Sequence, residues 1–199
     1  MANMGLIYTS SPVFIILLSI LFFKEKIRIN RVLGLVASLT GVLIIICKGN
    51  LVSLINFKFT SGDLWMTGAA IGWALYSIYL LNWKSNFSIM ERFTLIAMFG
   101  SISLAPFYFL EEMYFAKTSF DLNFYFWVLF AAISPGIIAF TLYTKVQKYL
   151  GASLTGFTLY LFAVYGSIFG IILFDENLMK FHYIGGSLVF LGVYLAKKN

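Results

Sequence analysis

Few side chains in this chain could do acid–base or metal chemistry. His182 and Cys47 are the only residues of their types, so they cannot supply a histidine cluster or an internal disulfide. The apolar segments carry no ionisable residue near their centres, which argues against a metal enzyme, a protease or a proton relay working inside them. We therefore expect no enzymatic activity, no cofactor and no metal site.

The remaining candidates for contact with a solute carry hydroxyl groups or aromatic rings. Pro12 follows a run of hydroxyl residues and should free a backbone carbonyl, which needs a partner or a cavity. The alternative is an ordinary helix start near a membrane surface. Ser134 and Pro135 interrupt a second apolar segment in the same way. Trp73 and Tyr76, three residues apart on one helix, would stack on an amphipathic solute, or else pack or face lipid.

Together these features define the residues that we expect to line a substrate cavity. Tyr143, Tyr160 and Tyr165 are weaker candidates of the same aromatic kind. The full set of cavity candidates is Tyr8, Ser11, Pro12, Trp73, Tyr76, Ser134, Pro135, Tyr143 and Tyr160.

The composition predicts an all-α integral membrane protein. The 199 residues are 61% hydrophobic and only 11% charged, and the mean hydropathy is +0.91. A span needs about 20 apolar residues. Seven segments qualify, with tight connections between most of them: Gly5–Phe23, Arg31–Cys47, Asp63–Leu81, Phe93–Leu110, Phe124–Thr144, Ala152–Phe174 and Tyr183–Ala196, the last beginning near Lys180. The sequence Ser61-Gly62-Asp63 suits the start of the third helix.

The basic residues predict the orientation of these spans. Cytoplasmic connections are enriched in Lys and Arg. One face receives Lys24, Lys26, Arg28, Arg31, Lys84, Arg92, Lys145, Lys148, Lys197 and Lys198, and the other receives Lys48, Lys58, Lys117 and Lys180. We therefore expect the N-terminus outside and the C-terminus in the cytoplasm. The net charge of +6 is explained by topology, so no nucleic-acid partner is expected.

One stretch of the sequence occurs twice. Residues 23–42, FKEKIRINRVLGLVASLTGV, align with residues 174–193, FDENLMKFHYIGGSLVFLGV, after a shift of 151 positions. Each copy has an apolar helix, a charged break and a helix with two glycines seven residues apart. The matched structural positions are Glu25, Gly34, Gly41, Glu176, Gly185 and Gly192. We expect the glycines to serve helix packing or a dimer contact, and the glutamates to complement helix starts.

The two copies are expected to have opposite orientations in the membrane. They lie five spans apart, and an odd offset inverts the second copy, as in secondary transporters. We expect residues 1–48 to be the last two helices of one repeat, 49–61 a connecting loop, and 62–199 a complete five-helix repeat. The first repeat would then lack about 90 residues, and the chain would be the C-terminal part of a ten-helix, 5+5 bundle.

Several phrases resemble the EamA-type members of the drug/metabolite transporter superfamily. They are Ser11-Pro12-Val13-Phe14, Lys24-Glu25-Lys26-Ile27, Gly62-Asp63-Leu64, Trp73-Ala74-Leu75-Tyr76, YTKVQKYLGAS from Tyr143 to Ser153, Tyr160-Leu161-Phe162-Ala163-Val164 and Asp175-Glu176-Asn177-Leu178. The resemblance covers the whole chain and implies ten helices in two inverted five-helix repeats. The chain departs where relatives have Glu-Pro, here Phe162-Ala163, and where they have Gly before Glu, here Lys24 and Asp175.

The resemblance implies a permease of the bacterial inner membrane. It would move a small amphipathic metabolite or drug-like solute by alternating access. Its partners would be the lipid bilayer, the solute, and a second copy or another protein supplying the missing helices. The alternative is a non-transporting membrane subunit, or an inactive truncated product that needs such a partner.

Overall fold

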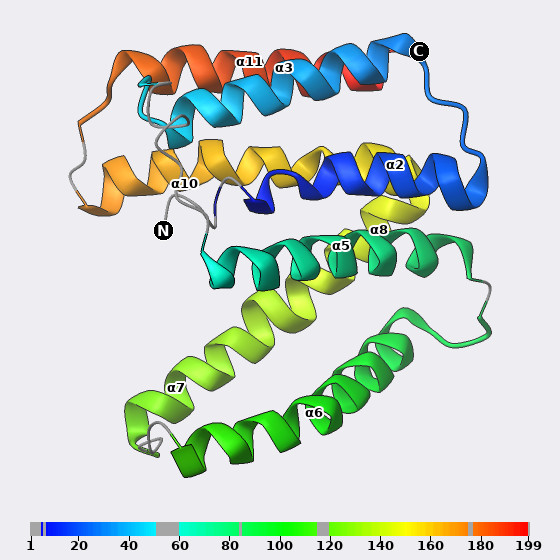
Figure 1. Ribbon diagram of the computed structural model, residues 1–199, viewed down its shortest axis with the longest axis vertical. Coiled ribbons are helices and arrows are strands. Elements are labelled where there is room, and N and C mark those ends of the chain that lie inside the picture. The colour runs from blue at the N-terminus through cyan, green and yellow to red at the C-terminus, as the bar shows by residue number, and fades with distance from the viewer. Residues whose placement is uncertain are drawn as a thin grey trace. The chain divides into compact units, whose positions relative to one another are not determined.

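The chain folds into helices throughout the part that the structure describes. The computed structural model describes residue 5 and residues 7–50, 60–83, 85–114, 120–174 and 177–198, and these contain no strand (Figure 1). The helices are α2 Ser11–Phe23, α3 Ile29–Ile46, α5 Ser61–Asn82, α6 Ile89–Tyr114, α7 Leu122–Ala131, the π-helix η1 Ala132–Ala139, α8 Phe140–Leu150, α9 Ala152–Gly156, α10 Thr158–Phe174 and α11 Lys180–Lys197.

The lengths and composition of these helices confirm the predicted all-α membrane fold. Among the described residues, five helical segments are long and apolar enough to cross a membrane: Ile29–Ile46, Ser61–Asn82, Ile89–Tyr114, Leu122–Leu150 and Ala152–Phe174. α2 is a shorter apolar helix, and α11 begins at Lys180 as the sequence predicts.

Two of the predicted spans contain a break. The first span, predicted as continuous from Gly5, is interrupted by a turn at Thr9 and Ser10, where the Ser10 hydroxyl donates to the carbonyl oxygen of Ile7. Such local bonds compete with the helix ladder, and Pro12 cannot donate to it. The sixth span has a break at Phe157, between α9 and α10.

Local chemistry fixes other helix ends. The carboxylate of Asp63 accepts hydrogen bonds from the backbone N–H of Thr60 (2.7 Å) and from its hydroxyl (2.9 Å), which places α5 as predicted. α2 ends at Lys24 in the left-handed region (φ 51°), with the Lys24 and Glu25 N–H groups bonded to the carbonyl oxygens of Ile20 and Ser19.

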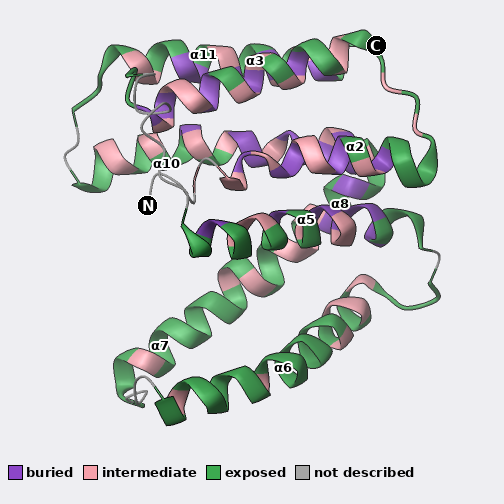
Figure 2. Cartoon of the chain, viewed as in Figure 1, coloured by how far each residue is buried: buried purple, intermediate pink, exposed green. Residues whose placement is uncertain are grey.

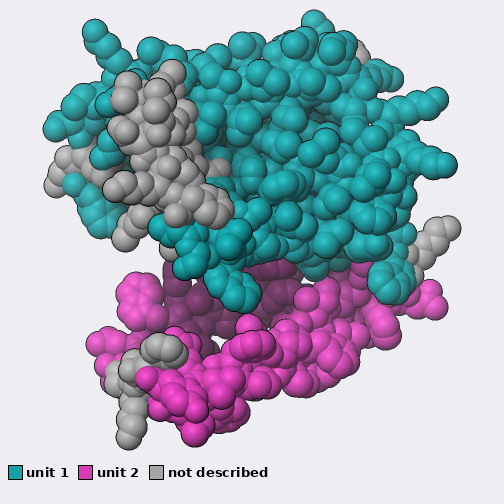
Figure 3. All heavy atoms as spheres, viewed as in Figure 1, with its two compact units in different colours: residues 1–83, 150–199 teal, residues 84–149 magenta. Residues whose placement is uncertain are grey.

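The chain divides into two compact units, residues 1–83 with 150–199 and residues 84–149 (Figure 3). The first unit holds the buried residues of its core between α2, α3, α5, α9, α10 and α11 (Figure 2). One cluster joins α2, α3, α10 and α11 through Ile16, Val42, Tyr160, Val164 and Val189. A second cluster joins α2, α5 and the α9–α10 region.

Glycine pairs set the distance between the antiparallel helices α3 and α11, which lie side by side in Figure 1. A Cβ added to Gly34 would lie 2.5 Å from the carbonyl oxygen of Gly192, and one added to Gly41 would lie 2.5 Å from that of Gly185. At the centre, the Ser38 hydroxyl donates to the carbonyl oxygen of Val189 (3.4 Å). Gly34 and Gly185 lie 151 positions apart in the sequence, as do Gly41 and Gly192. The two glycine pairs are therefore equivalent under the repeat, as in a contact with two-fold symmetry.

The second unit consists of α6, α7, η1 and α8 up to Tyr149. Its helices α6, α7 and η1 contain no buried residue (Figure 2). Phe93 of α6 and Phe140 of α8 stack with ring centroids 5.5 Å apart. η1 contains Pro135, and α6 contains Pro106.

Candidate functional site

The packing of α2 against α5 and the α9–α10 region brings several of the predicted cavity residues together. We call this region the α2 seam: Ser11 and Pro12 from the start of α2, Tyr8 from just before it, Trp73 and Tyr76 from α5, Gly156 from α9, and Tyr160 of α10, which belongs to the cluster of Ile16 and not to that of Trp73. Tyr8 and Trp73 pack on the same buried cluster, Ile15, Ala74, Ile78, Ala152 and Leu159.

Pro12 begins a helix in the α2 seam. It occupies the first turn of α2, where a missing N–H removes no helical hydrogen bond. Ser11 and Pro12 are both fully buried, and a Cβ on Gly156 would lie 3.6 Å from the Cα of Pro12. Gly156, the last residue of α9, therefore packs directly against the first turn of α2.

Trp73 and Tyr76 form an aromatic pair on α5. Their ring centroids are 5.5 Å apart with the planes tilted by 39°, and both side chains are half-buried. Half-burial leaves part of each ring surface available to another molecule, whereas a core aromatic pair would be covered on all sides.

Buried hydroxyl groups add polarity to the interior along α2 and α10. Among the described residues, the side-chain oxygens of Ser11, Ser19 and Tyr160 are buried and have no hydrogen-bond partner. Ser11 and Ser19 belong to α2, and Tyr160 belongs to α10. Buried hydroxyls are normally satisfied by protein or water, so each can accept or donate a bond to a water or a solute. Ser19 is an addition to the predicted set, and helical spacing from Ser11, two turns away, could have indicated it.

The other predicted candidates lie elsewhere. Ser134 and Pro135 belong to η1 and Tyr143 to α8, all in the second unit, and π-helical turns occur often at functional sites. Tyr165 of α10 is exposed. The structure thus places the candidates of the first unit other than Tyr165 along α2, and leaves Tyr165 outside this seam.

Glu25 has two partners that stabilise the connection between α2 and α3. One carboxylate oxygen accepts a hydrogen bond from Arg31 in an ion pair (2.7 Å), and the other accepts one from the hydroxyl of Ser153 at the start of α9 (2.6 Å). The sequence did not indicate Ser153 as a partner because 128 residues separate it from Glu25. The equivalent Glu176 lies outside the described residues.

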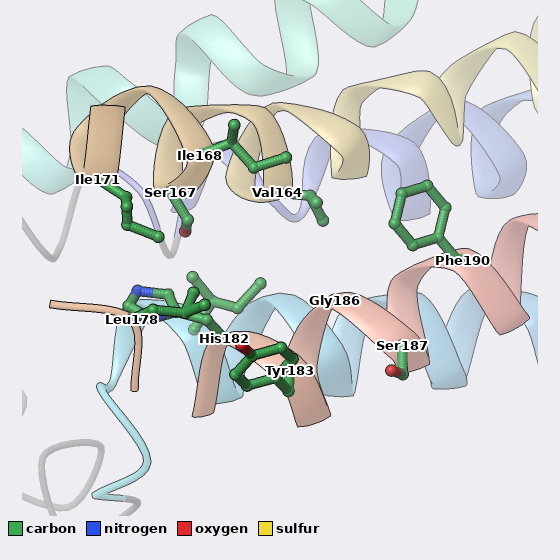
Figure 4. Close-up of a pocket in the computed structure, with 11 residues that line it drawn as sticks. Val164, Ser167, Ile168, Ile171, Leu178, His182, Tyr183, Gly186, Ser187 and Phe190 are labelled. Carbon is green, nitrogen blue, oxygen red and sulfur yellow. The ribbon is translucent and has the colours of Figure 1, made fainter. Parts of the chain in front are cut away.

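A cavity of about 230 Å³ lies between α10 and α11, next to Ile45 of α3 (Figure 4). In the close-up, side chains of α10 point toward α11 across this space. Its walls are mostly aliphatic and aromatic, with Ser167, His182, Tyr183 and Ser187 as the polar exceptions. No residue predicted to line a substrate cavity lies in this wall.

The fold and these sites define a multi-pass helical membrane protein with reciprocal helix packing. A sequence model of the EamA-like transporter family matches residues 1–47 and 60–197, so the chain belongs to that family.

Individual relatives agree with this assignment. The uncharacterized transporter YyaM of Bacillus subtilis (strain 168) is 23% identical over 98% of this chain and 63% of its own length. An uncharacterized transporter of Methanothermobacter thermautotrophicus is 24% identical over 99% of this chain and 57% of its own length. The chain therefore spans less than two thirds of the length of these relatives.

One solved crystal structure has the same fold. It matches 98% of this chain and 66% of its own chain with a TM-score of 0.77 and 20% sequence identity. At that identity the likeness concerns the fold.

Proposed function

We propose that the protein is a permease that moves a small amphipathic organic solute across the membrane by alternating access. Family membership is the observation that carries this proposal. The reciprocal glycine contacts between α3 and α11 support it, because inverted repeats that meet at a central axis can rock against each other around a fixed site.

We place the solute contacts in the α2 seam. The half-buried pair Trp73 and Tyr76 offers ring faces, and the buried hydroxyls of Ser11 and Tyr160 offer hydrogen bonds. None of the described residues that define this seam is acidic or basic, so a largely apolar solute with a few polar groups suits it best.

The proposal includes an assembly and a location. The chain spans only part of its relatives, and α6, α7 and η1 contain no buried residue. A second copy, or a partner that supplies further helices, would cover such surfaces. The location is the inner membrane of a bacterium, with the N-terminus outside and the C-terminus in the cytoplasm.

Transport by the full chain in liposomes tests the solute site. With N-acetyltryptophan amide as an uncharged amphipathic probe, we expect Trp73→Ala to lower the initial flux roughly tenfold, the effect of losing about 1.4 kcal/mol of binding. Trp65→Ala is the matched control, because Trp65 lies on the same helix and is 83% exposed.

The possible results distinguish an error in the proposed solute site from an error in the proposed transport function. Equal loss in both variants would indicate a general effect on α5, and unchanged flux in Trp73→Ala would remove Trp73 from the site. If the unaltered chain gives no flux until the equivalent N-terminal helices of a relative are added, transport requires a partner that supplies further helices.

A further inference from the structure

The cavity between α10 and α11 has a filled counterpart in the other copy of the repeat. Equivalent positions of the two copies lie 151 residues apart, so Ser167 and Gly186 of the cavity wall correspond to Ile16 and Leu35 in the other copy. Ile16 is a buried member of the core, and Leu35 packs against the same cluster. The same positions thus hold two large aliphatic side chains in one copy and a hydroxymethyl group and a hydrogen atom in the other.

The replacement of these large side chains by small ones creates the space. A Cβ built on Gly186 has no atom within 4 Å, although Gly186 is a buried residue. Ser167 turns its hydroxyl back to the carbonyl oxygen of Ala163 (2.8 Å), so its polar group is satisfied within α10. The cavity is therefore a space between α10 and α11 that larger side chains at these two positions would occupy, and such apolar space is costly when nothing fills it.

The cavity has a polar end and an apolar end. His182 lies in the first turn of α11, whereas Phe190 lies near its middle, eight residues and about 12 Å further along the helix. One leaflet of the hydrocarbon core is about 15 Å thick. The Nδ1 atom of His182 accepts a hydrogen bond from the backbone N–H of Met179 (3.0 Å), so in the neutral ring Nε2 carries the hydrogen.

The mouth of the cavity is on the outside of the helix pair. Ile168, Tyr183 and Phe190 form part of the wall and are also exposed large apolar side chains. For helices embedded in a membrane, such a surface contacts lipid chains. A chain can therefore enter from the side, without passing through the protein.

We propose that this cavity binds one acyl chain of a membrane phospholipid, with the chain between α10 and α11 and the ester or phosphate oxygens near His182 and Tyr183. The site is separate from the α2 seam. Its length matches one leaflet, its polar end lies beside Ile171 near the end of the candidate span Ala152–Phe174, and its other end lies beside Val164 nearer the middle of that span.

Replacing Gly186 by leucine, the residue at the equivalent position 35 of the other copy, tests the proposal. The unaltered chain is reconstituted with phosphatidylcholine that carries a photoactivatable diazirine in one acyl chain, and labelled peptides are identified by mass spectrometry. We expect labelling of residues 164–190, and Gly186→Leu should reduce it on the order of tenfold, as a loss of about 1.4 kcal/mol in affinity implies. Gly166→Leu on α10 is the matched control, because its Cβ also meets open space but it does not line the cavity.

Thermal unfolding in detergent distinguishes a bound lipid from an empty space. We expect added phosphatidylcholine to raise the Tm of the unaltered chain and of Gly166→Leu, but not that of Gly186→Leu, since a ligand stabilises the state that binds it. If added phosphatidylcholine raises the Tm of Gly186→Leu as much as that of the unaltered chain, or raises neither, the lipid does not occupy the cavity and the proposal is overturned. Labelling by a diazirine-bearing free fatty acid that phosphatidylcholine does not displace would also overturn it, in favour of a soluble amphiphile.

Discussion

The conformation of Lys24 gives a physical reason for a departure from the family pattern. The resemblance to the family implies Gly before the Glu of this break, and this position adopts the left-handed conformation at the end of α2 (φ 51°). Glycine adopts that region readily, whereas other L-residues pay a steric cost of about 1–2 kcal/mol. The family glycine is therefore explained by backbone geometry, and Lys24 retains the geometry at a cost.

We expect Lys24→Gly to stabilise the protein. The left-handed strain disappears, while the extra freedom of glycine in the unfolded chain offsets part of the gain, which leaves about 1 kcal/mol. The measurement is the free energy of unfolding in mixed micelles. Lys26→Gly removes the same charge from the same connection without a left-handed residue, so it should give no gain. Equal stabilisation by both variants would assign the effect to charge.

At the scale of elements, the contact between α3 and α11 depends on small residues. A Cβ on Gly192 would overlap the Ser38 hydroxyl and approach the carbonyl oxygen of Gly34 to 2.5 Å and the backbone nitrogen of Ser38 to 2.6 Å. The obstructing atoms include backbone, which cannot rotate away as a side chain could. Close approach of transmembrane helices generally requires small residues for this reason.

We expect Gly192→Ala to lower the free energy of unfolding by about 1–3 kcal/mol, the usual cost of overpacking. Gly72→Ala on α5 is the control, because a Cβ there meets no atom within 4 Å and alanine favours a helix over glycine. Denaturant unfolding of both variants should therefore give changes of opposite sign. An unchanged free energy of unfolding in Gly192→Ala would mean that α3 and α11 accommodate the added methyl group without cost.

For the whole molecule, the distribution of basic residues predicts which ends of the helices face the cytoplasm. Lys24, Lys26, Arg28 and Arg31 cluster in the connection between α2 and α3, so that connection should be cytoplasmic and the far end of α3 external.

Cysteine labelling in intact cells checks this orientation. Cys47 is only 7% exposed and is first replaced by Ser. In that background we expect Asn50→Cys to react with a membrane-impermeant maleimide and Lys26→Cys to react only after the membrane is permeabilised. The reverse pattern would invert the proposed topology. A mixture of both patterns would indicate that this chain inserts in two orientations.

The sequence by itself determined the class of fold and the approximate positions of the helices. Long apolar segments in water-free surroundings must satisfy their own backbone groups, so they become helices regardless of their neighbours. The capping of α5 by Asp63 and the start of α11 at Lys180 were also predicted, because each depends on a few adjacent residues. The internal repeat and the family motifs were also recognised from the sequence, because each consists of residues at fixed spacings along the chain.

Only the tertiary structure decided which residues meet across long distances in the sequence. It grouped Tyr8, Trp73 and the start of α2 around one cluster, and it joined Glu25 to Ser153. The cavity beside Gly186 is a further case. Each depends on how closely two helices approach and how they are rotated, which side-chain volumes across the contact determine. A pattern along one helix does not contain that information, because an exposed glycine and one lining a cavity look the same in sequence.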